Sequence, residues 1–329
     1  MAQDRAAASP IWSGDELINK NDWVIDFGSA CGSGPTFPDN VRTKLRKFGI
    51  ALVSGMPVAG KSDVEVSVLL KSYVLKLGCP VSQSAKLDFL GEVTDRGSDI
   101  SNHQSRGYES AAELPFHSDR CDLLSLLCVR QAPVGGETRV VNAYAAYTAL
   151  QKKAPELAQV LCQPVPFDLR DTSGGARWAM MPIFSISEGV FLARYVRRFI
   201  EASQRFDDAP RITDTQLAAF DAFDAVLESP GMSLDLRLRP GDWLLIDNHR
   251  MLHSRTAYRD ADEPGQARLL FRSWLCWPGS PELPHCYSAT YGRTEAGSLR
   301  GGVWPESKPI TSLPSDLVQA REALGALIA

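Results

Sequence analysis

Two histidines and one aspartate in this sequence have the chemistry and the spacing of a metal site. His117 and Asp119 lie two residues apart in the segment 114–119. In a β-strand, side chains two residues apart point to the same face, so one metal ion could bind both. His253, much later in the chain, could supply a second imidazole. Two histidines and one carboxylate on one face of an octahedron leave three positions open, which is typical of non-haem Fe(II) oxygenases.

The same histidines allow other interpretations. A single His-x-Asp pair arises easily by chance, and a histidine at the end of a strand can simply be hydrogen-bonded. His249 and His253 lie four residues apart, so on a helix both could bind zinc. However, no Glu stands beside His249, and the preceding apolar segment does not favour a long helix. We therefore expect His249 to be exposed or to lie behind the metal ligands.

Two arginines in the apolar segment 267–277 could bind an anion. Arg268 and Arg272 are four residues apart, so a strand would place both on the same face. Burying guanidinium groups is costly unless anions neutralise them. The two side chains could form structural salt bridges, or they could bind a carboxylate, whose geometry the guanidinium fork matches.

The segment from Gly55 to Ser62 satisfies the phosphate-binding pattern G-x-x-x-x-G-K-[ST]. It stands between an apparent strand and an apparent helix, and a second apolar segment, Trp243–Asp247, could end in a magnesium-binding Asp. A P-loop nucleotide hydrolase needs a parallel sheet of repeated strand–helix units, whereas most of this chain reads as strand following strand. We favour a solvated turn here and keep the hydrolase as the alternative.

The hydrophobic pattern predicts a mainly β protein with flanking helices. Apolar or alternating segments predict strands, and longer periodic segments predict helices. The expected strands are 50–53, 123–130, 137–142, 233–238, 243–247 and 267–277, with a hairpin over 181–192. The expected helices are 38–48, 64–77, 144–161 with a break at Pro155, 214–227 and 315–328. This order favours a closed or sandwich-like β core in a single domain over residues 1–329.

Composition and charge describe an ordinary globular protein. The 329 residues are 44% hydrophobic and 22% charged, and the net charge is −4. This charge offers no footprint for nucleic acid or an anionic membrane, and no apolar run approaches the ~18 residues that span a bilayer. The first ten residues lack the apolar core of a signal peptide, and the seven cysteines read as reduced, buried thiols. We expect a cytoplasmic protein that binds a small molecule and that could form a homo-oligomer.

Several motifs together resemble the taurine dioxygenase-like family of Fe(II)/2-oxoglutarate oxygenases. They recur in the order found in that family and extend from the strand and turn near residue 50 to about Trp277. The apparent P-loop is accounted for as well, because members commonly have an apolar strand followed by Gly-x-Pro at this point. The motifs are His117-x-Asp119, Gly135-Gly136-Glu137-Thr138, the pattern D-N-x-R-x-x-H from Asp247 to His253, and Arg268 with Arg272.

The resemblance implies a double-stranded β-helix (jelly-roll, cupin-like) core that binds iron through His117, Asp119 and His253. It implies that Arg268 pairs with the distal carboxylate of 2-oxoglutarate, helped by the Thr138 hydroxyl. The expected reaction uses O2, releases succinate and CO2, and hydroxylates a C–H bond of the substrate. Desaturation, ring closure and epoxidation stay open, as does a non-catalytic jelly-roll binding protein.

The resemblance also bears on the substrate. The loop between His253 and Arg268 is slightly longer than in taurine dioxygenase and closer to that of clavaminate synthase-like members, which act on amino acids. We therefore expect a small carboxylate-bearing, amino-acid-like substrate under a lid or insert at about 164–230, together with the loop 101–110. Candidate substrate-binding residues, each of which could instead belong to a solvated charged face or a salt bridge, are Arg272, Arg120, Arg194 and Arg197.

Overall fold

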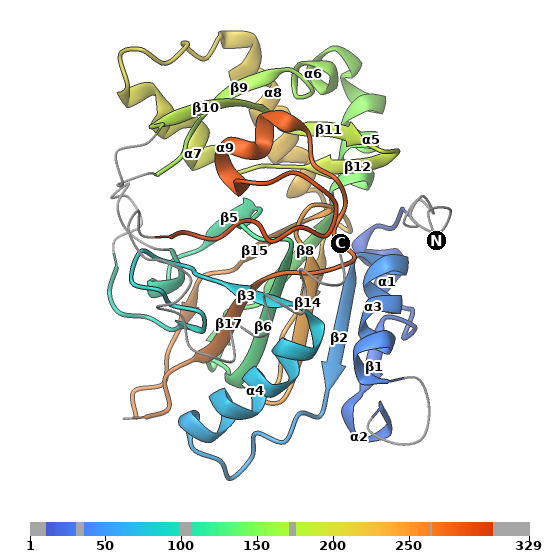
Figure 1. The fold of residues 1–329 in the computed structure, drawn as a ribbon, viewed down its shortest axis with the longest axis vertical. Helices are drawn as coiled ribbons and strands as arrows, with labels where there is room; N and C mark the ends of the chain where they lie inside the picture. The colour runs from blue at the N-terminus through green and yellow to red at the C-terminus, as the bar shows by residue number, and fades with distance from the viewer. Residues whose placement is uncertain (1–10, 31–35, 99–106, 171–175, 264, 305–329) are drawn as a thin grey trace.

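Alternating apolar residues along the strands build a sandwich of two sheets in the computed structural model of the chain (Figure 1). The structure describes residues 11–30, 36–98, 107–170, 176–263 and 265–304. The helix expected at 315–328 and residues 101–106 of the expected loop lie outside these ranges. No helix within them is long and apolar enough to cross a membrane.

The larger sheet carries the most apolar segments of the sequence. Six of its seven strands follow the order β1-β2-β14-β6-β17-β3, and β4 also pairs with β17. β1 and β2 run parallel, whereas the other pairs are antiparallel. The strands are β1 (Val24–Asp26), β2 (Ile50–Ser54), β3 (Cys79–Val81), β4 (Gly91–Val93), β6 (Leu123–Arg130), β14 (Trp243–Asp247) and β17 (Leu269–Cys276).

Helices α3 (Phe37–Phe48) and α4 (Asp63–Leu77) cover the outer face of the larger sheet. Apolar side chains such as Val41 and Leu70 pack there against Leu245. Because the second sheet covers the opposite face, β6 and β14 are buried on both sides and read as continuous apolar runs.

The smaller sheet is antiparallel and has the strand order β13-β8-β15-β5. Its inner face packs Val140 and Met251 against side chains of the larger sheet, including Leu244 and Leu270. Its strands are β5 (Leu114–His117), β8 (Thr138–Asn142), β13 (Leu234–Leu236) and β15 (Met251–Arg255).

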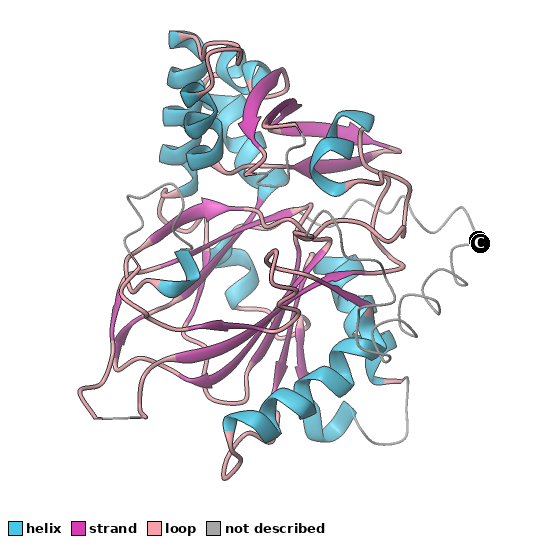
Figure 2. Cartoon of the chain, turned by 60° about the vertical axis from the view of Figure 1, so that its left-hand side comes forward, coloured by secondary structure: helices cyan, strands magenta, loops and turns pink. Residues whose placement is uncertain are grey.

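An outer layer formed by residues 143–227 covers the other face of the smaller sheet (Figure 2). Phe116 of β5 and Leu252 of β15 belong to the same buried apolar cluster as Phe220 and Phe223 of this layer. Its elements are α5 (Ala143–Lys153), α6 (Pro155–Val160), β9 (Pro164–Asp168), β10 (Trp178–Pro182), β11 (Phe184–Ser187), β12 (Val190–Ala193), α7 (Arg197–Ala202), η3 (Ser203–Arg205) and α8 (Asp214–Leu227).

The remaining elements are short and lie at the edges of these layers. They are α1 (Gly14–Ile18), α2 (Phe27–Ala30), η2 (Gly107–Glu109), β7 (Val134–Gly135), β16 (Tyr258–Arg259), η4 (His285–Tyr287) and α9 (Ser288–Tyr291).

Most of the expected elements are confirmed. The strands expected at 123–130 and 243–247 and the helix at 214–227 match β6, β14 and α8, and Pro155 separates α5 from α6. The hairpin expected over 181–192 is wrong at its start, because Met181 belongs to β10 and pairs with β9. The expectation that the cysteines are all buried is also wrong, because Cys162 and Cys286 are exposed.

The structure does not favour the nucleotide-hydrolase alternative. β2, the strand before Gly55, is parallel to the short edge strand β1 but antiparallel to β14, so it does not belong to the parallel sheet of repeated strand–helix units that such an enzyme needs. Ser62 caps α4: its hydroxyl accepts the N–H of Glu65, and the Glu65 carboxylate accepts the N–H of Ser62. The segment is therefore the turn and cap that lead into a surface helix.

The turn before β14 offers a test of how tightly the strands are held. Gly241 has φ 90°, and a Cβ there would lie 2.6 Å from the carbonyl oxygen of Met56. Gly189, with φ 76°, has nothing within 4 Å of such a Cβ and is the matched control. We expect Gly189→Ala to lower the free energy of unfolding by about 1 kcal/mol and Gly241→Ala by at least ~2 kcal/mol more, in urea denaturation. Equal losses would show that Met56 moves away without cost.

Candidate active site

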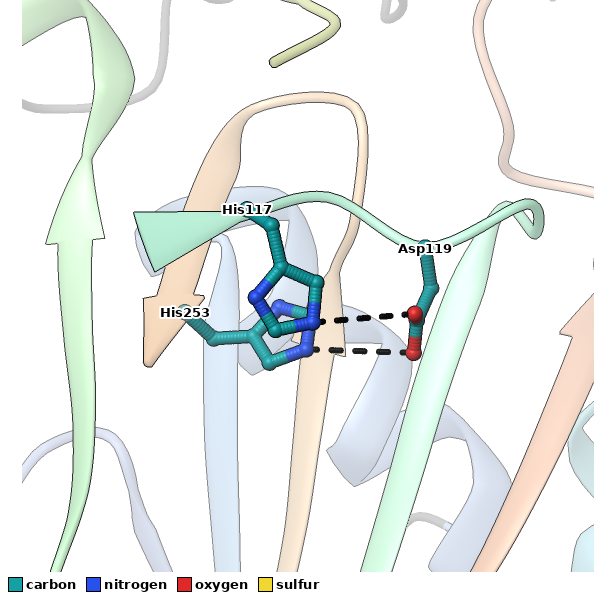
Figure 3. A group of neighbouring side chains, drawn as sticks. All are labelled: His117, Asp119 and His253. Carbon is teal, nitrogen blue, oxygen red and sulfur yellow. Dashed lines mark ion pairs between the residues drawn. The ribbon is translucent and has the colours of Figure 1, made fainter. Parts of the chain in front are cut away.

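The pairing of β5 with β15 brings two histidines together at one end of the sandwich. His117 lies directly opposite His253 in the register, and their ring centroids are 4.2 Å apart. Asp119 follows β5 in the next loop, and its carboxylate oxygens lie 3.8 Å from Nε2 of each imidazole. Figure 3 shows the three side chains pointing toward one another. Their possible ligand atoms all lie within 4.8 Å of one another. This donor set has the size and composition to hold one divalent metal ion.

Strand alternation turns these histidines toward the inside of the sandwich. Phe116 and Leu252, the neighbours of the two histidines in sequence, point into the outer layer. Because successive side chains of a strand face opposite sides, His117 and His253 face the larger sheet. Asp119 lies just beyond the end of β5, so it reaches the site from a loop and not from the strand itself.

Both imidazoles are neutral, and a backbone contact orients that of His117. Nδ1 of His117 lies 2.8 Å from the carbonyl oxygen of Pro115, so a proton on Nδ1 leaves the Nε2 lone pair for a metal. Burial lowers the pKa of His117, and burial together with His117 lowers the pKa of His253 to about 3. Both rings are therefore ready to bind a cation at neutral pH.

Strand β17 of the opposite sheet holds the Asp119 carboxylate. The indole Nε1 of Trp274 donates to Oδ2 at 2.8 Å, and Nη1 of Arg272 lies 3.6 Å from the same oxygen. Gln83 accepts from Nε of Arg272 at 2.6 Å and fixes that guanidinium. Burial alone would raise the pKa of Asp119, but Arg272 and the two histidines outweigh it and hold the pKa below its usual value.

The main chain around Asp119 is fixed by two further side chains. Asn248 accepts the N–H of Asp119 and donates to the carbonyl oxygens of Asp119 and Cys121. Arg194 donates through Nη1 to the carbonyl oxygens of Ser118 and Asp119 at 2.6 and 2.9 Å. The predicted substrate residue Arg194 thus contacts the backbone of the loop that carries the metal ligand.

The guanidinium of Arg197, another predicted substrate residue, is already engaged in ion pairs. Its guanidinium is shared among carboxylates of α7 and α8, namely Glu201, Asp221 and Asp224. A substrate anion would have to displace these three groups. The sequence could not show this, because two of the partners lie on a helix more than 20 positions away.

Arg120 donates to the carbonyl oxygen of Leu169 and lines a cavity of about 320 Å³. Tyr291, the last residue of α9, and Arg293, which follows the helix, line the same cavity. The three metal-site residues do not line it, so this cavity lies beside the metal loop and not over the metal site.

His249 is buried, which contradicts the first of its two expected positions. Its Nε2 lies 2.7 Å from Oδ1 of Asp122, and Arg300 donates to the same oxygen. The zinc-protease arrangement is excluded, because His249 precedes β15 and is not on a helix. His249 therefore belongs to a buried network behind the metal loop.

A second polar cluster lies further along β15. Arg268 precedes β17, is buried, and donates to Gln131 and to the carbonyl oxygen of Gly136. Thr138 lies opposite Arg255 in the register of β8 and β15. The expected partners Arg268 and Thr138 are thus accompanied by Arg255, a buried arginine that the sequence motifs did not single out.

The protein family described as taurine catabolism dioxygenase TauD, TfdA family, matches residues 22–274 of this chain. This chain belongs to that family. FR-33289 synthase of Streptomyces rubellomurinus is 32% identical over 267 residues, which are 80% of this chain and 76% of that protein. A uridine-5'-phosphate dioxygenase of Amycolatopsis sp. is 28% identical over 251 residues, 72% of this chain and 88% of that protein.

Solved structures of non-haem iron oxygenases have the same fold. OrfP, in complex with Fe, succinate and (3S)-hydroxy-L-Arg, has a TM-score of 0.52 at 19% identity and covers 72% of this chain and 80% of its own. Asparagine oxygenase, in complex with Fe(II), 2S,3S-3-hydroxyasparagine and succinate, has a TM-score of 0.54 at 15% identity, covering 77% and 93%. The expected jelly-roll core is confirmed, and the protein is an Fe(II)/2-oxoglutarate-dependent dioxygenase.

The hydrogen bond from Trp274 to Asp119 predicts a measurable effect on metal binding. Trp274→Phe removes the indole N–H and should weaken Fe(II) binding by roughly 10-fold, because groups that orient a ligand typically contribute that much. Trp277→Phe is the control, because the Trp277 indole N–H is buried but makes no hydrogen bond with the described residues. The measurement is an anaerobic competition titration with a chromophoric chelator. The same change in both variants would assign the effect to packing.

The lowered pKa values of the histidines predict how metal binding depends on pH. Two histidines with ordinary pKa values would lose roughly tenfold in metal affinity between pH 7.5 and 6.0 through protonation. Here acidification protonates the rings only below their lowered pKa values, about 3 for His253. We therefore expect the Fe(II) affinity to fall by clearly less than tenfold over this range. A tenfold loss would show that the rings titrate as exposed histidines do.

Proposed function

We propose that this dioxygenase hydroxylates a C–H bond of a small, carboxylate-bearing metabolite of amino-acid type, with His117, Asp119 and His253 as the iron ligands. The observation that carries the proposal is the convergence of these three side chains inside a jelly roll, where no other group of this kind is found among the described residues. The neighbouring structures support the substrate type, because they contain hydroxylated arginine and asparagine.

Iron and 2-oxoglutarate, when bound, supply the oxidising chemistry, in which O2 is consumed and succinate and CO2 are released. The chain positions them. Trp274 and Arg272 engage Oδ2 of Asp119, which orients the carboxylate toward the two imidazoles. Burial between two sheets keeps water away from the reacting atoms. Arg268 and Thr138 are proposed to hold the distal carboxylate of 2-oxoglutarate.

We further propose that the segment 164–230 covers the site as its lid within a single domain. Strand β12 leads directly into Tyr195, whose carbonyl oxygen accepts the N–H of Ser118 at 2.9 Å. The Tyr195 N–H in turn donates to the Ser118 hydroxyl. These bonds tie the segment to the loop that carries Asp119, which supports a role in enclosing the substrate.

Arg272 is the best placed of the arginines to face an anionic substrate. It lies beside Asp119, whereas Arg120 opens into the neighbouring cavity, and Arg194 and Arg197 are bound by other groups of the chain. A phosphate monoester is the second candidate, because guanidinium binds phosphate as well as carboxylate and two relatives are uridine-5'-phosphate dioxygenases.

We propose a cytoplasmic enzyme whose partner is its small-molecule substrate, without nucleic acid or membrane, and which could form a homo-oligomer. The net charge of −4 supports both exclusions.

The decisive test adds Fe(II) and 2-oxoglutarate without oxygen and records the weak visible charge-transfer band. We expect His117→Ala to abolish the band and to lower succinate release with oxygen by at least ~100-fold, because one metal ligand is lost. Lys61→Ala, in the turn before α4, should leave both unchanged. A charge-transfer band that survives His117→Ala would show that His117 is not an iron ligand. Activity that depends on Lys61 would favour the nucleotide-hydrolase alternative.

Succinate release then identifies the substrate class. Screening free and N-substituted amino acids against nucleoside 5'-phosphates distinguishes the two candidates, because a true substrate increases succinate formation in proportion to product. Stimulation by phosphate monoesters alone would overturn the amino-acid proposal and leave the iron site intact.

A further inference from the structure

Two buried arginines beyond the metal site have no anion to neutralise them. Arg255 ends β15 and is 5% exposed, and Arg268 precedes β17 and is 1% exposed. Both guanidinium carbons lie 4.9 Å from the ring centroid of Tyr258, so the two cations share one aromatic ring. No carboxylate of the described residues forms an ion pair with either arginine.

Several donors of this cluster are buried and unpaired. Nε and Nη1 of Arg255, Nη1 of Arg268 and the hydroxyl of Tyr258 have no hydrogen-bond partner among the described residues. The other guanidinium atoms are occupied: Nη2 of Arg255 donates to the carbonyl oxygens of Ser110 and Ala112. The two guanidinium groups that carry these unpaired donors are therefore held in place by their other hydrogen bonds.

Such an arrangement is unfavourable without a ligand. Burial lowers the pKa of both guanidinium groups, and repulsion by Arg268 helps to lower that of Arg255 to about 10. Each unpaired buried donor costs about 1–3 kcal/mol, and more when it is charged. An oxyanion placed among these donors would relieve both penalties.

The cluster faces the same interior as the metal site. Arg255 lies two residues after His253 on β15, so both side chains point to the inner face of the sheet. Thr138 lies opposite Arg255, and the main chain makes room for Arg268 at Gly136, where a Cβ would lie 2.9 Å from Nε of that arginine. One strand thus carries a metal ligand and, about 7 Å further along, a cationic group.

We propose that Arg255 and Tyr258 join Arg268 in a clamp for the distal carboxylate of 2-oxoglutarate, and that Arg255 makes the enzyme select a dicarboxylic 2-oxo acid. The inference rests on the proposed iron site, since the metal fixes the other end of the cosubstrate. Two guanidinium groups and a hydroxyl give the carboxylate more donors than the expected pair of Arg268 and Thr138 alone. A 2-oxo acid that ends in a methyl group would leave all of these donors unpaired.

The test compares two cosubstrates of equal chain length by anaerobic calorimetry with the Fe(II)-loaded enzyme. 2-Oxoglutarate carries the distal carboxylate, and 2-oxovalerate has a methyl group in its place. We expect Arg255→Met to weaken 2-oxoglutarate binding by about 10- to 100-fold and to change 2-oxovalerate binding less than twofold. Tyr258→Phe should give a smaller loss with the same selectivity.

Arg139→Met is the matched control. Arg139 lies on the adjacent strand β8 but points outward to Glu228 and Asp235, so its loss should affect neither cosubstrate. If Arg255→Met does not fold, as judged by circular dichroism, Arg255→Lys decides, because it keeps the charge but loses the guanidinium fork. It should then lower the preference for 2-oxoglutarate by several-fold.

The outcomes separate this proposal from the one on which it rests. If the unaltered enzyme binds neither 2-oxo acid in an Fe(II)-dependent way, the iron-site assignment fails and the clamp with it. If the unaltered enzyme binds 2-oxoglutarate and the Arg255 variants lose both ligands equally or neither, only the clamp is wrong. Loss confined to 2-oxoglutarate supports it.

Discussion

The burial of one carboxylate between two sheets is the constraint on which this site depends. A buried anion is stable only where cations and hydrogen-bond donors surround it. Asp119 finds such a cation and such a donor in Arg272 and Trp274, from β17 of the larger sheet. The neutral imidazoles of His117 and His253 face the carboxylate from the smaller sheet. The carboxylate thus connects the two sheets at the proposed metal site.

Strand register decides which side chains face Asp119 and the interior between the two sheets. His253 and Arg255 point inward on β15 because Leu252, the neighbour of His253, is buried in the outer layer and successive side chains of a strand face opposite sides. Arg272 and Trp274 point inward on β17 because Phe271 packs on the outer face, against the cluster that contains α3 and α4. A shift by one residue would bury charged groups among apolar side chains, so the apolar residues between the functional ones fix the geometry of the site.

The parts of this structure that depend on local pattern could be predicted from the sequence. β6 and β14 are continuous apolar runs, α8 has a helical apolar pattern, and the proposed iron ligands stand in motifs with fixed spacing. Arg255 and Trp274 could not be recognised, since an arginine ending a strand and a tryptophan in an apolar run are unremarkable until the register is known. Arg197 was a candidate because the sequence shows its charge but not its ion pairs. In the fold, its guanidinium pairs with Asp221 and Asp224 of α8.

Positive charge is concentrated in the interior of an acidic chain. The net charge is −4, yet Arg255 and Arg268 are buried without a carboxylate partner and Arg272 shares the single carboxylate of Asp119. A bound divalent cation adds to this excess, so the interior favours a ligand with two negative charges over one with a single charge. Coupling of this kind is reciprocal: if the cation strengthens binding of the dianion, the dianion strengthens retention of the cation by the same factor. With the proposed iron site and arginine clamp, the placement of arginines along β15 and β17 would therefore make iron and a dicarboxylic 2-oxo acid stabilise each other.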